Sequence, residues 1–246
     1  MAFIIVTSGG RAPKRIDDES NHRHRQLIGY IGLVLPMLLI FLAIYWDGLD
    51  VWRQLDSVSA YYYTGANPAF VGMLVVLALF LFTYDGYKNE SQWADRWFSN
   101  AAAVAALGVA FFPTAAPKID GISALRWWEP WVGVVHFTSA AVLFGIFALF
   151  CLWLFRKKAK QEADSDKRNR NAVYVICGTV IIVCIFWAGY EGLRDRSIFW
   201  PESIALIFFA ISWLVKGYAM RSVADVARSW LTPKASALDE EDMSKR

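Results

Sequence analysis

Six long runs of apolar residues constrain this 246-residue chain more than any other feature. Each run approaches the roughly 20 residues that an α-helix, rising about 1.5 Å per residue, needs to cross about 30 Å of hydrocarbon. Because backbone groups in lipid must form hydrogen bonds within their own segment, such runs become helices. Strands of a membrane barrel would alternate apolar and polar residues, and these runs do not. The predicted spans cover residues 27–46, 68–84, 97–113, 131–155, 173–191 and 199–216.

The overall composition agrees with a membrane protein. Hydrophobic residues make up 57% of the chain and charged residues 19%, which leaves too few polar side chains to cover a water-soluble domain. Three cysteines cannot build the disulfide framework of a small secreted protein. The predicted fold class is therefore all-α: a polytopic membrane protein with a bundle of six transmembrane helices. This domain would cover residues 26–217, between polar tails at 1–25 and 218–246.

The distribution of Lys and Arg predicts the orientation in the membrane. Twenty of these residues fall in the two tails and in alternate loops, and five fall in the remaining loops. Since cytoplasmic segments carry the excess of Lys and Arg, both termini are predicted to be cytoplasmic in the cell inner membrane. The basic segments would contact anionic membrane lipids, and their pattern does not predict a nucleic-acid partner.

Small residues in the third run predict close helix packing. Ala102, Ala106 and Ala110 recur every four residues, with Gly108 nearby, and so lie on one face of a helix. Small side chains allow neighbouring backbones to approach closely inside a membrane. We expect this face to be buried against other spans.

Ionisable residues near one end of the spans are the first candidates for a site. His136 lies about five residues into the fourth predicted span, Glu191 ends the fifth, and Glu202 lies in the first turn of the sixth. All three are on the outer side in the predicted orientation. Because an ionisable group in a span is costly unless it faces protein or water, they predict an outward-opening polar pocket.

Each of these residues also has a purely structural interpretation. Glu202 follows Pro201, and an acid after a first-position proline is typical of a helix start. Glu191 can form an ion pair with Arg194 or Arg196. His136 can be a packed side chain that only forms a hydrogen bond.

The loop before the second span adds four candidate ligand-binding residues: Ser57, Ser59, Tyr61 and Tyr62. A cluster of tyrosines and serines can form a lid that hydrogen-bonds into the pocket. The alternative is that the aromatic rings anchor the loop at the membrane interface.

Several strings along the chain carry a family resemblance. They are Ser57-x-Ser59-x-Tyr61-Tyr62-Tyr63, Phe70-Val71-Gly72, Phe112-Pro113-Thr114 with His136, and Glu202 with Ser212-Trp213-Leu214-Val215-Lys216-Gly217. On these residues the chain resembles a group of uncharacterised bacterial multi-pass integral membrane proteins. The resemblance implies a compact helical bundle with these positions along one side, and it implies no assigned function.

Binding is favoured over catalysis. We expect the protein to bind or move a small solute, a proton or a lipid head group through the outer-facing pocket, without a cofactor or a metal. One alternative is an intramembrane metal-dependent lipid hydrolase, similar to the ceramidase and progestin-receptor-like superfamily. That superfamily uses several histidines around zinc, whereas His136 is the only histidine in a predicted span here, so Glu191 and Glu202 would have to complete the site. The other alternative is a non-catalytic structural or accessory membrane subunit.

Overall fold

The computed structural model describes residues 14–48, 55–84, 86, 92–118, 122–157 and 164–217. These residues form α-helices and short 3-10 helices, without a strand among them, so the predicted all-α class is confirmed for this part of the chain. The α-helices are α1 (Lys14–Asp47), α2 (Asn67–Phe82), α3 (Gln92–Phe111), α4 (Pro130–Leu152), α5 (Asp164–Gly192) and α6 (Phe199–Lys216). The 3-10 helices are η1 (Ser59–Tyr63) and η2 (Leu154–Arg156).

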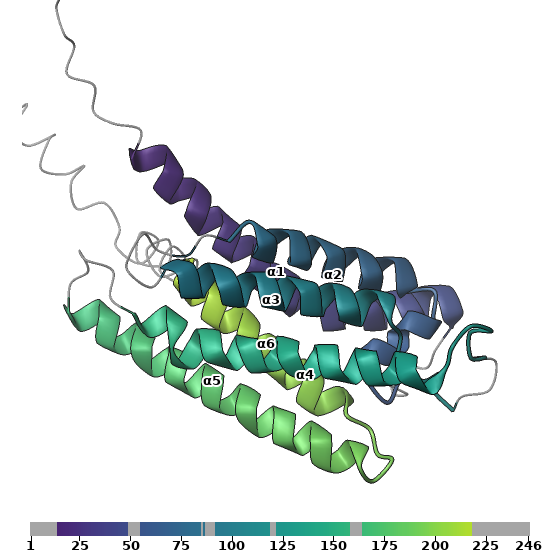
Figure 1. The fold of residues 1–246 in the computed structure, drawn as a ribbon. Helices are drawn as coiled ribbons and strands as arrows, with labels where there is room; N and C mark the ends of the chain where they lie inside the picture. The colour runs from purple at the N-terminus through teal and green to yellow at the C-terminus, as the bar shows by residue number, and fades with distance from the viewer. Residues whose placement is uncertain are drawn as a thin grey trace, which may run out of the picture.

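The α-helices form a closed ring in chain order (Figure 1). Each helix packs against the one before and the one after it, and α6 closes the ring against α1. Helices α1 and α6 are antiparallel, since Gln26 Nε2 donates to the Gly217 carbonyl at 2.8 Å while Gly32, further along α1, lies against Phe209. The opposite end of the ring, where α1 ends and α6 begins, carries η1 and is called the η1 end.

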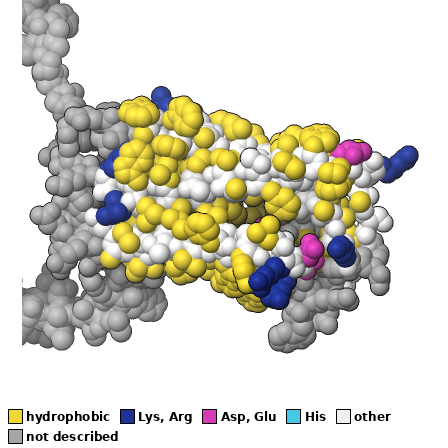
Figure 2. Space-filling view, turned by 60° about the horizontal axis from the view of Figure 1, so that its bottom comes forward, with side chains coloured by type: hydrophobic (Ala, Val, Ile, Leu, Met, Phe, Trp, Pro, Cys, Tyr) yellow, Lys and Arg dark blue, Asp and Glu magenta, His cyan; other side chains and the backbone are white. Residues whose placement is uncertain are grey.

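The surface of the ring is that of a membrane protein. Four segments are long and apolar enough to cross a membrane: His22–Asp47, Pro130–Arg156, Arg170–Gly192 and Phe199–Lys216. Helix α2 is apolar but has only 16 residues, and α3 carries Asp95 and Arg96 near its start. Figure 2 shows a largely hydrophobic flank, with the charged side chains gathered toward its two ends. A surface of this kind is favourable against lipid and costly in water.

The inside of the ring is filled by aromatic side chains. The rings of Phe147 (α4) and Phe209 (α6) are stacked with their centroids 3.7 Å apart, and both side chains are fully buried. Trp213 is also fully buried, with its ring centroid 5.4 Å from that of Phe150. These contacts link α4 and α6 across the ring. The interior of the ring is therefore packed where these aromatic side chains lie.

Small residues allow the helices to approach one another. Ala102, Ala106 and Ala110 are fully buried on α3, as their spacing predicted. A Cβ atom added at Gly29 on α1 would lie 2.8 Å from Leu214 Cγ and 3.0 Å from the Ala210 carbonyl oxygen of α6. These distances are below normal van der Waals contact, so the α1–α6 contact requires glycine at this position.

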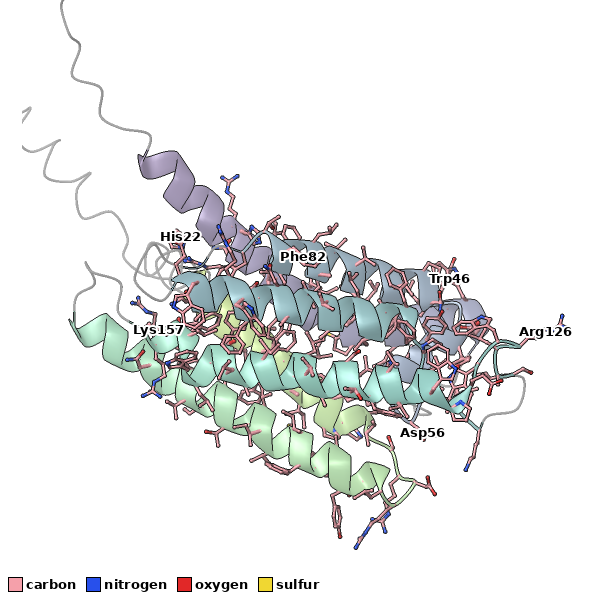
Figure 3. The ribbon with its side chains drawn as sticks, viewed as in Figure 1. His22, Trp46, Asp56, Phe82, Arg126 and Lys157 are labelled. Carbon is pink, nitrogen blue, oxygen red and sulfur yellow. The ribbon has the colours of Figure 1, made fainter. Side chains whose placement is uncertain are left out.

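The first helix starts earlier than the hydropathy pattern predicted. A polar tail was expected up to residue 25, but α1 begins at Lys14. The backbone hydrogen bonds of a helix do not depend on apolar side chains, so polar residues can extend α1 beyond its apolar run. Within this polar part of α1, His24 donates from Nε2 to the Phe80 carbonyl of α2 at 2.6 Å. Residues 1–13 and the predicted tail at 218–246 lie outside the described part of the chain. His22 and Lys157 mark one end of the molecule in Figure 3, and Trp46, Asp56 and Arg126 mark the other.

Candidate functional site

The loop between α1 and α2 folds inward at the η1 end. In this segment, here called the η1 cap (residues 55–66), most side chains are buried: Leu55, Ser57, Val58, Ser59, Ala60, Tyr61 and Ala66. Ser57 Oγ accepts the Ala60 N–H at 3.0 Å, which stabilises the first turn of η1. A connecting loop normally lies on the surface. The η1 cap is different, because its buried side chains form part of the core.

Contacts with the start of α6 hold the η1 cap in place. The Val58 N–H donates to Glu202 Oε2 at 2.7 Å, and the Ile198 N–H donates to the Asp56 carbonyl at 2.7 Å. The ring of Tyr61 lies 6.2 Å from that of Phe199. Glu202 thus does more than start its own helix, because its carboxylate also satisfies a backbone donor of a segment 144 residues away.

Three consecutive backbone carbonyls after α3 form a second junction at this end. Each accepts a hydrogen bond from a side chain of a different segment, and this set is called the carbonyl clasp. Its members are Phe112 with His136 Nδ1 at 2.7 Å, Pro113 with Trp128 Nε1 at 3.1 Å, and Thr114 with the Tyr63 hydroxyl at 2.6 Å. The segment that follows α3 is therefore hydrogen-bonded to α4, to the loop before α4 and to the η1 cap, and these bonds satisfy three backbone carbonyls outside the helix.

Two tyrosines of the η1 cap, Tyr61 and Tyr63, keep their hydroxyl protons over a wide pH range. Burial raises the pKa of Tyr61 above its ordinary value of 10.0, although a hydrogen bond with the Leu55 backbone lowers it in part. Burial likewise raises the pKa of the Tyr63 hydroxyl, and the neighbouring Tyr62 raises it further. The clasp bond of Tyr63 is therefore not switched by pH changes near neutrality.

A cavity of about 570 Å³ lies between α4, α5 and α6 in the half of the ring near the η1 end. In Figure 1, α5 separates from α4 toward this end. The lining is apolar except for the Cys184 thiol and one charged side chain, Glu202. Small residues of α5, among them Ala188 and Gly189, face the aromatic side chains of Phe137 and Phe144 on α4. The volume is within the roughly 300–1,000 Å³ typical of small-molecule sites.

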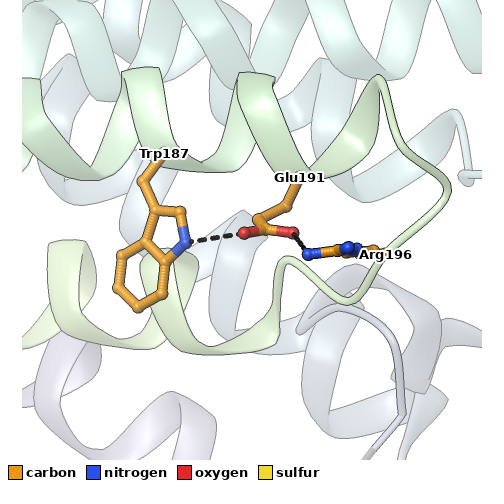
Figure 4. Close-up of polar contacts among 3 residues, drawn as sticks. All are labelled: Trp187, Glu191 and Arg196. Carbon is orange, nitrogen blue, oxygen red and sulfur yellow. Dashed lines mark hydrogen bonds and ion pairs between the residues drawn. The ribbon is translucent and has the colours of Figure 1, made fainter.

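Glu191 forms two polar contacts beside the cavity. Its Oε1 accepts the Trp187 Nε1–H at 3.4 Å, and its Oε2 lies 3.7 Å from Arg196 Nη1 (Figure 4). The guanidinium of Arg194 lies 4.1 Å from the centre of the Tyr190 ring. The ion-pair interpretation of Glu191 thus agrees with the observed geometry, with Arg196 as the partner.

The predicted site residues are only partly brought together. Ser57, Ser59 and Tyr61 lie in the η1 cap, which contacts Glu202 through Val58. Tyr62 is half-buried and its ring lies edge-on to Phe70. The His136 ring bonds to the end of α3, and neither His136 nor Glu191 is among the residues that line the cavity. Among the described residues, no group of three His, Cys, Asp or Glu side chains could hold a metal ion.

The opposite end of the ring holds buried charged side chains that were not predicted as part of a site. Arg25, Asp95 and Lys216 are each at most 6% exposed. Lys216 Nζ donates to the Phe155 carbonyl at 3.0 Å, and the Arg25 guanidinium lies 5.8 Å from the centre of the Tyr84 ring. In the sequence these charged residues lie near the boundaries of apolar runs. The sequence does not tell whether such a side chain turns into the protein or extends into water.

The fold and the cavity are those of a helical membrane protein whose ring is capped at one end and hollowed beside α5. Residues 30–215 match the family described as a protein of unknown function (DUF998), and the chain belongs to this family. The match begins within α1 and ends within α6, so it includes α2 to α5, most of α6, the second half of α1 and the η1 cap. No curated protein and no solved structure matches the chain.

Proposed function

We propose that this protein spans the inner membrane six times, with both termini in the cytoplasm and the η1 end outside. The twenty-to-five distribution of Lys and Arg supports this orientation. The ring itself supports an even number of spans with both ends on one side, because six helices that alternate in direction return the chain to its starting side. The 16-residue α2 would rise only about 24 Å, and a bilayer adapts to such a short span by local thinning.

In this orientation the cavity lies in the outer half of the bilayer, and its function is to bind a lipid-like molecule. The observation that carries the proposal is the cavity of about 570 Å³ between α4, α5 and α6, apolar but for Glu202 and Cys184. Phe137, Ala141 and Gly189 line it and are also exposed on the outside of the ring, so a molecule could enter sideways from the membrane. An apolar site with one polar group suits an amphipathic ligand better than a hydrophilic solute.

The test is labelling with a photoactivatable, clickable dodecanol probe, followed by mass spectrometry to locate the crosslinks. Gly189→Phe should place a bulky side chain at the cavity, and its Cβ has room because a Cβ at Gly189 meets nothing within 4 Å. Gly145→Phe is the matched control, since Gly145 on α4 has the same open surroundings but does not line the cavity.

We expect crosslinks on α4, α5 and α6 in the wild-type protein, their loss in Gly189→Phe and their retention in Gly145→Phe. Crosslinks spread evenly around the ring, or equal labelling of the two variants, would reject the binding site. The structural or accessory role would then be the better explanation.

A further inference from the structure

Glu202 connects the cavity to the η1 cap. Its Oε2 accepts the Val58 N–H at 2.7 Å on one side, and the residue lines the cavity on the other. It is in the first turn of α6, where the helix dipole also favours a negative charge. The carboxylate is therefore held at a fixed position at one end of the cavity.

The other charged side chains of this region are directed elsewhere. Arg196 lies 3.7 Å from Glu191, and Arg194 lies over the Tyr190 ring. The remaining lining of the cavity carries no charge. The cavity thus has a single ionisable side chain, the Glu202 carboxyl group, in an apolar lining, and electrostatic attraction to a cation is stronger there than in water.

We infer that the ligand of this cavity is a cationic amphiphile, with a protonated amine or quaternary ammonium beside Glu202 and an apolar chain between α4 and α5. This inference rests on the proposed function. An anionic head group would be repelled by the carboxylate, and a neutral one would gain only a weaker hydrogen bond. The chain would lie along Phe137, Phe144 and Ile185, which provide apolar surface but no hydrogen-bonding side chain.

The experiment compares three competitors with the same chain length: dodecylammonium, dodecanol and dodecanoate. Each displaces the dodecanol photoprobe from the full-length protein in micelles of dodecyl maltoside, whose head group is uncharged. We expect dodecylammonium to displace the probe at a concentration about tenfold lower than dodecanol, with dodecanoate the weakest.

Two variants test the role of the charge. Glu202→Gln keeps an oxygen that can accept the Val58 N–H, so it should keep the fold and bind dodecanol while losing the preference for the ammonium ion. Ala188→Lys leaves Glu202 in place and puts a positive charge in the lining, so it should shift the preference toward dodecanoate.

The outcomes separate this inference from the proposed function. Equal displacement by the three competitors, or an ammonium preference that survives in Glu202→Gln and in Ala188→Lys, would overturn the cationic ligand and leave the cavity as a binding site. An absence of specific probe labelling in the wild-type protein would instead reject the proposed function itself.

Discussion

Replacing His136 by Leu should destabilise the junction between α3 and α4. The imidazole is 1% exposed, and its Nδ1 lies 2.7 Å from the Phe112 carbonyl oxygen. Since a carbonyl only accepts hydrogen bonds, Nδ1 carries the proton and donates it. Leucine has a similar bulk but no donor, so the main effect of the change is to leave the carbonyl without this partner.

The magnitude follows from the burial of this hydrogen bond. A buried polar group that loses its partner costs about 1–3 kcal/mol, and little water is present to replace the imidazole. We therefore expect His136→Leu to lower the free energy of unfolding by about 1–3 kcal/mol. Asparagine can present its amide near the position of Nδ1, so His136→Asn should recover part of the loss.

The assay is reversible unfolding in mixed micelles, with increasing fractions of a denaturing detergent and helix content as the readout. Val134→Ala is the control on the same helix, because the Val134 side chain is 65% exposed toward the lipid side. Folded His136→Leu protein should still be labelled by the dodecanol probe, since His136 does not line the cavity. An unchanged free energy of unfolding, or loss of probe labelling in folded protein, would refute the structural role assigned to this histidine.

Three further predictions address packing, pH and orientation. Gly29→Leu should lower the free energy of unfolding by about 1–3 kcal/mol through overpacking, whereas Gly72→Leu, where a Cβ meets open space, should have little effect in the same detergent assay. Tyr63→Phe should cost about 1 kcal/mol. Because burial raises the Tyr63 pKa, its contribution should be constant from pH 6 to pH 9 and be lost as the pH rises above about 10, where the unfolded state ionises first; a loss between pH 6 and 8 would contradict this. In intact cells, a membrane-impermeant maleimide should label Arg126→Cys but not Arg156→Cys, against a low background because the native cysteines are buried; the reverse pattern would invert the proposed orientation.

The helices could be predicted because hydrophobicity is a property of contiguous residues. Each of the six apolar runs coincides largely with one α-helix, and α6 has the bounds that its run indicated. The small-residue face of α3 could also be predicted, since helical periodicity alone puts Ala102, Ala106 and Ala110 on one side. The start of α1 could not, because polar residues continue a helix as readily as they form a tail.

The candidate site was less predictable because its parts are far apart in the chain. A shared position near one end of the spans predicted that His136, Glu191 and Glu202 meet in one pocket, but depth along a helix does not fix the direction of a side chain around it. In the folded ring, His136 bonds to the end of α3 and Glu191 lies beside Arg196. Glu202 alone of the three lines the cavity.

The amino-acid order alone thus predicts the helices and contains the Lys and Arg bias on which the proposed orientation rests, because both are read along the chain without knowledge of its packing. The tertiary structure decided which carbonyls the side chains of His136 and Tyr63 reach, and that the loop before α2 folds inward as a cap. It also decided that α5 leaves a hollow beside α4 and α6. These features arise from the packing of helix faces around a closed ring, where the rotation of each helix is set by all of its neighbours together.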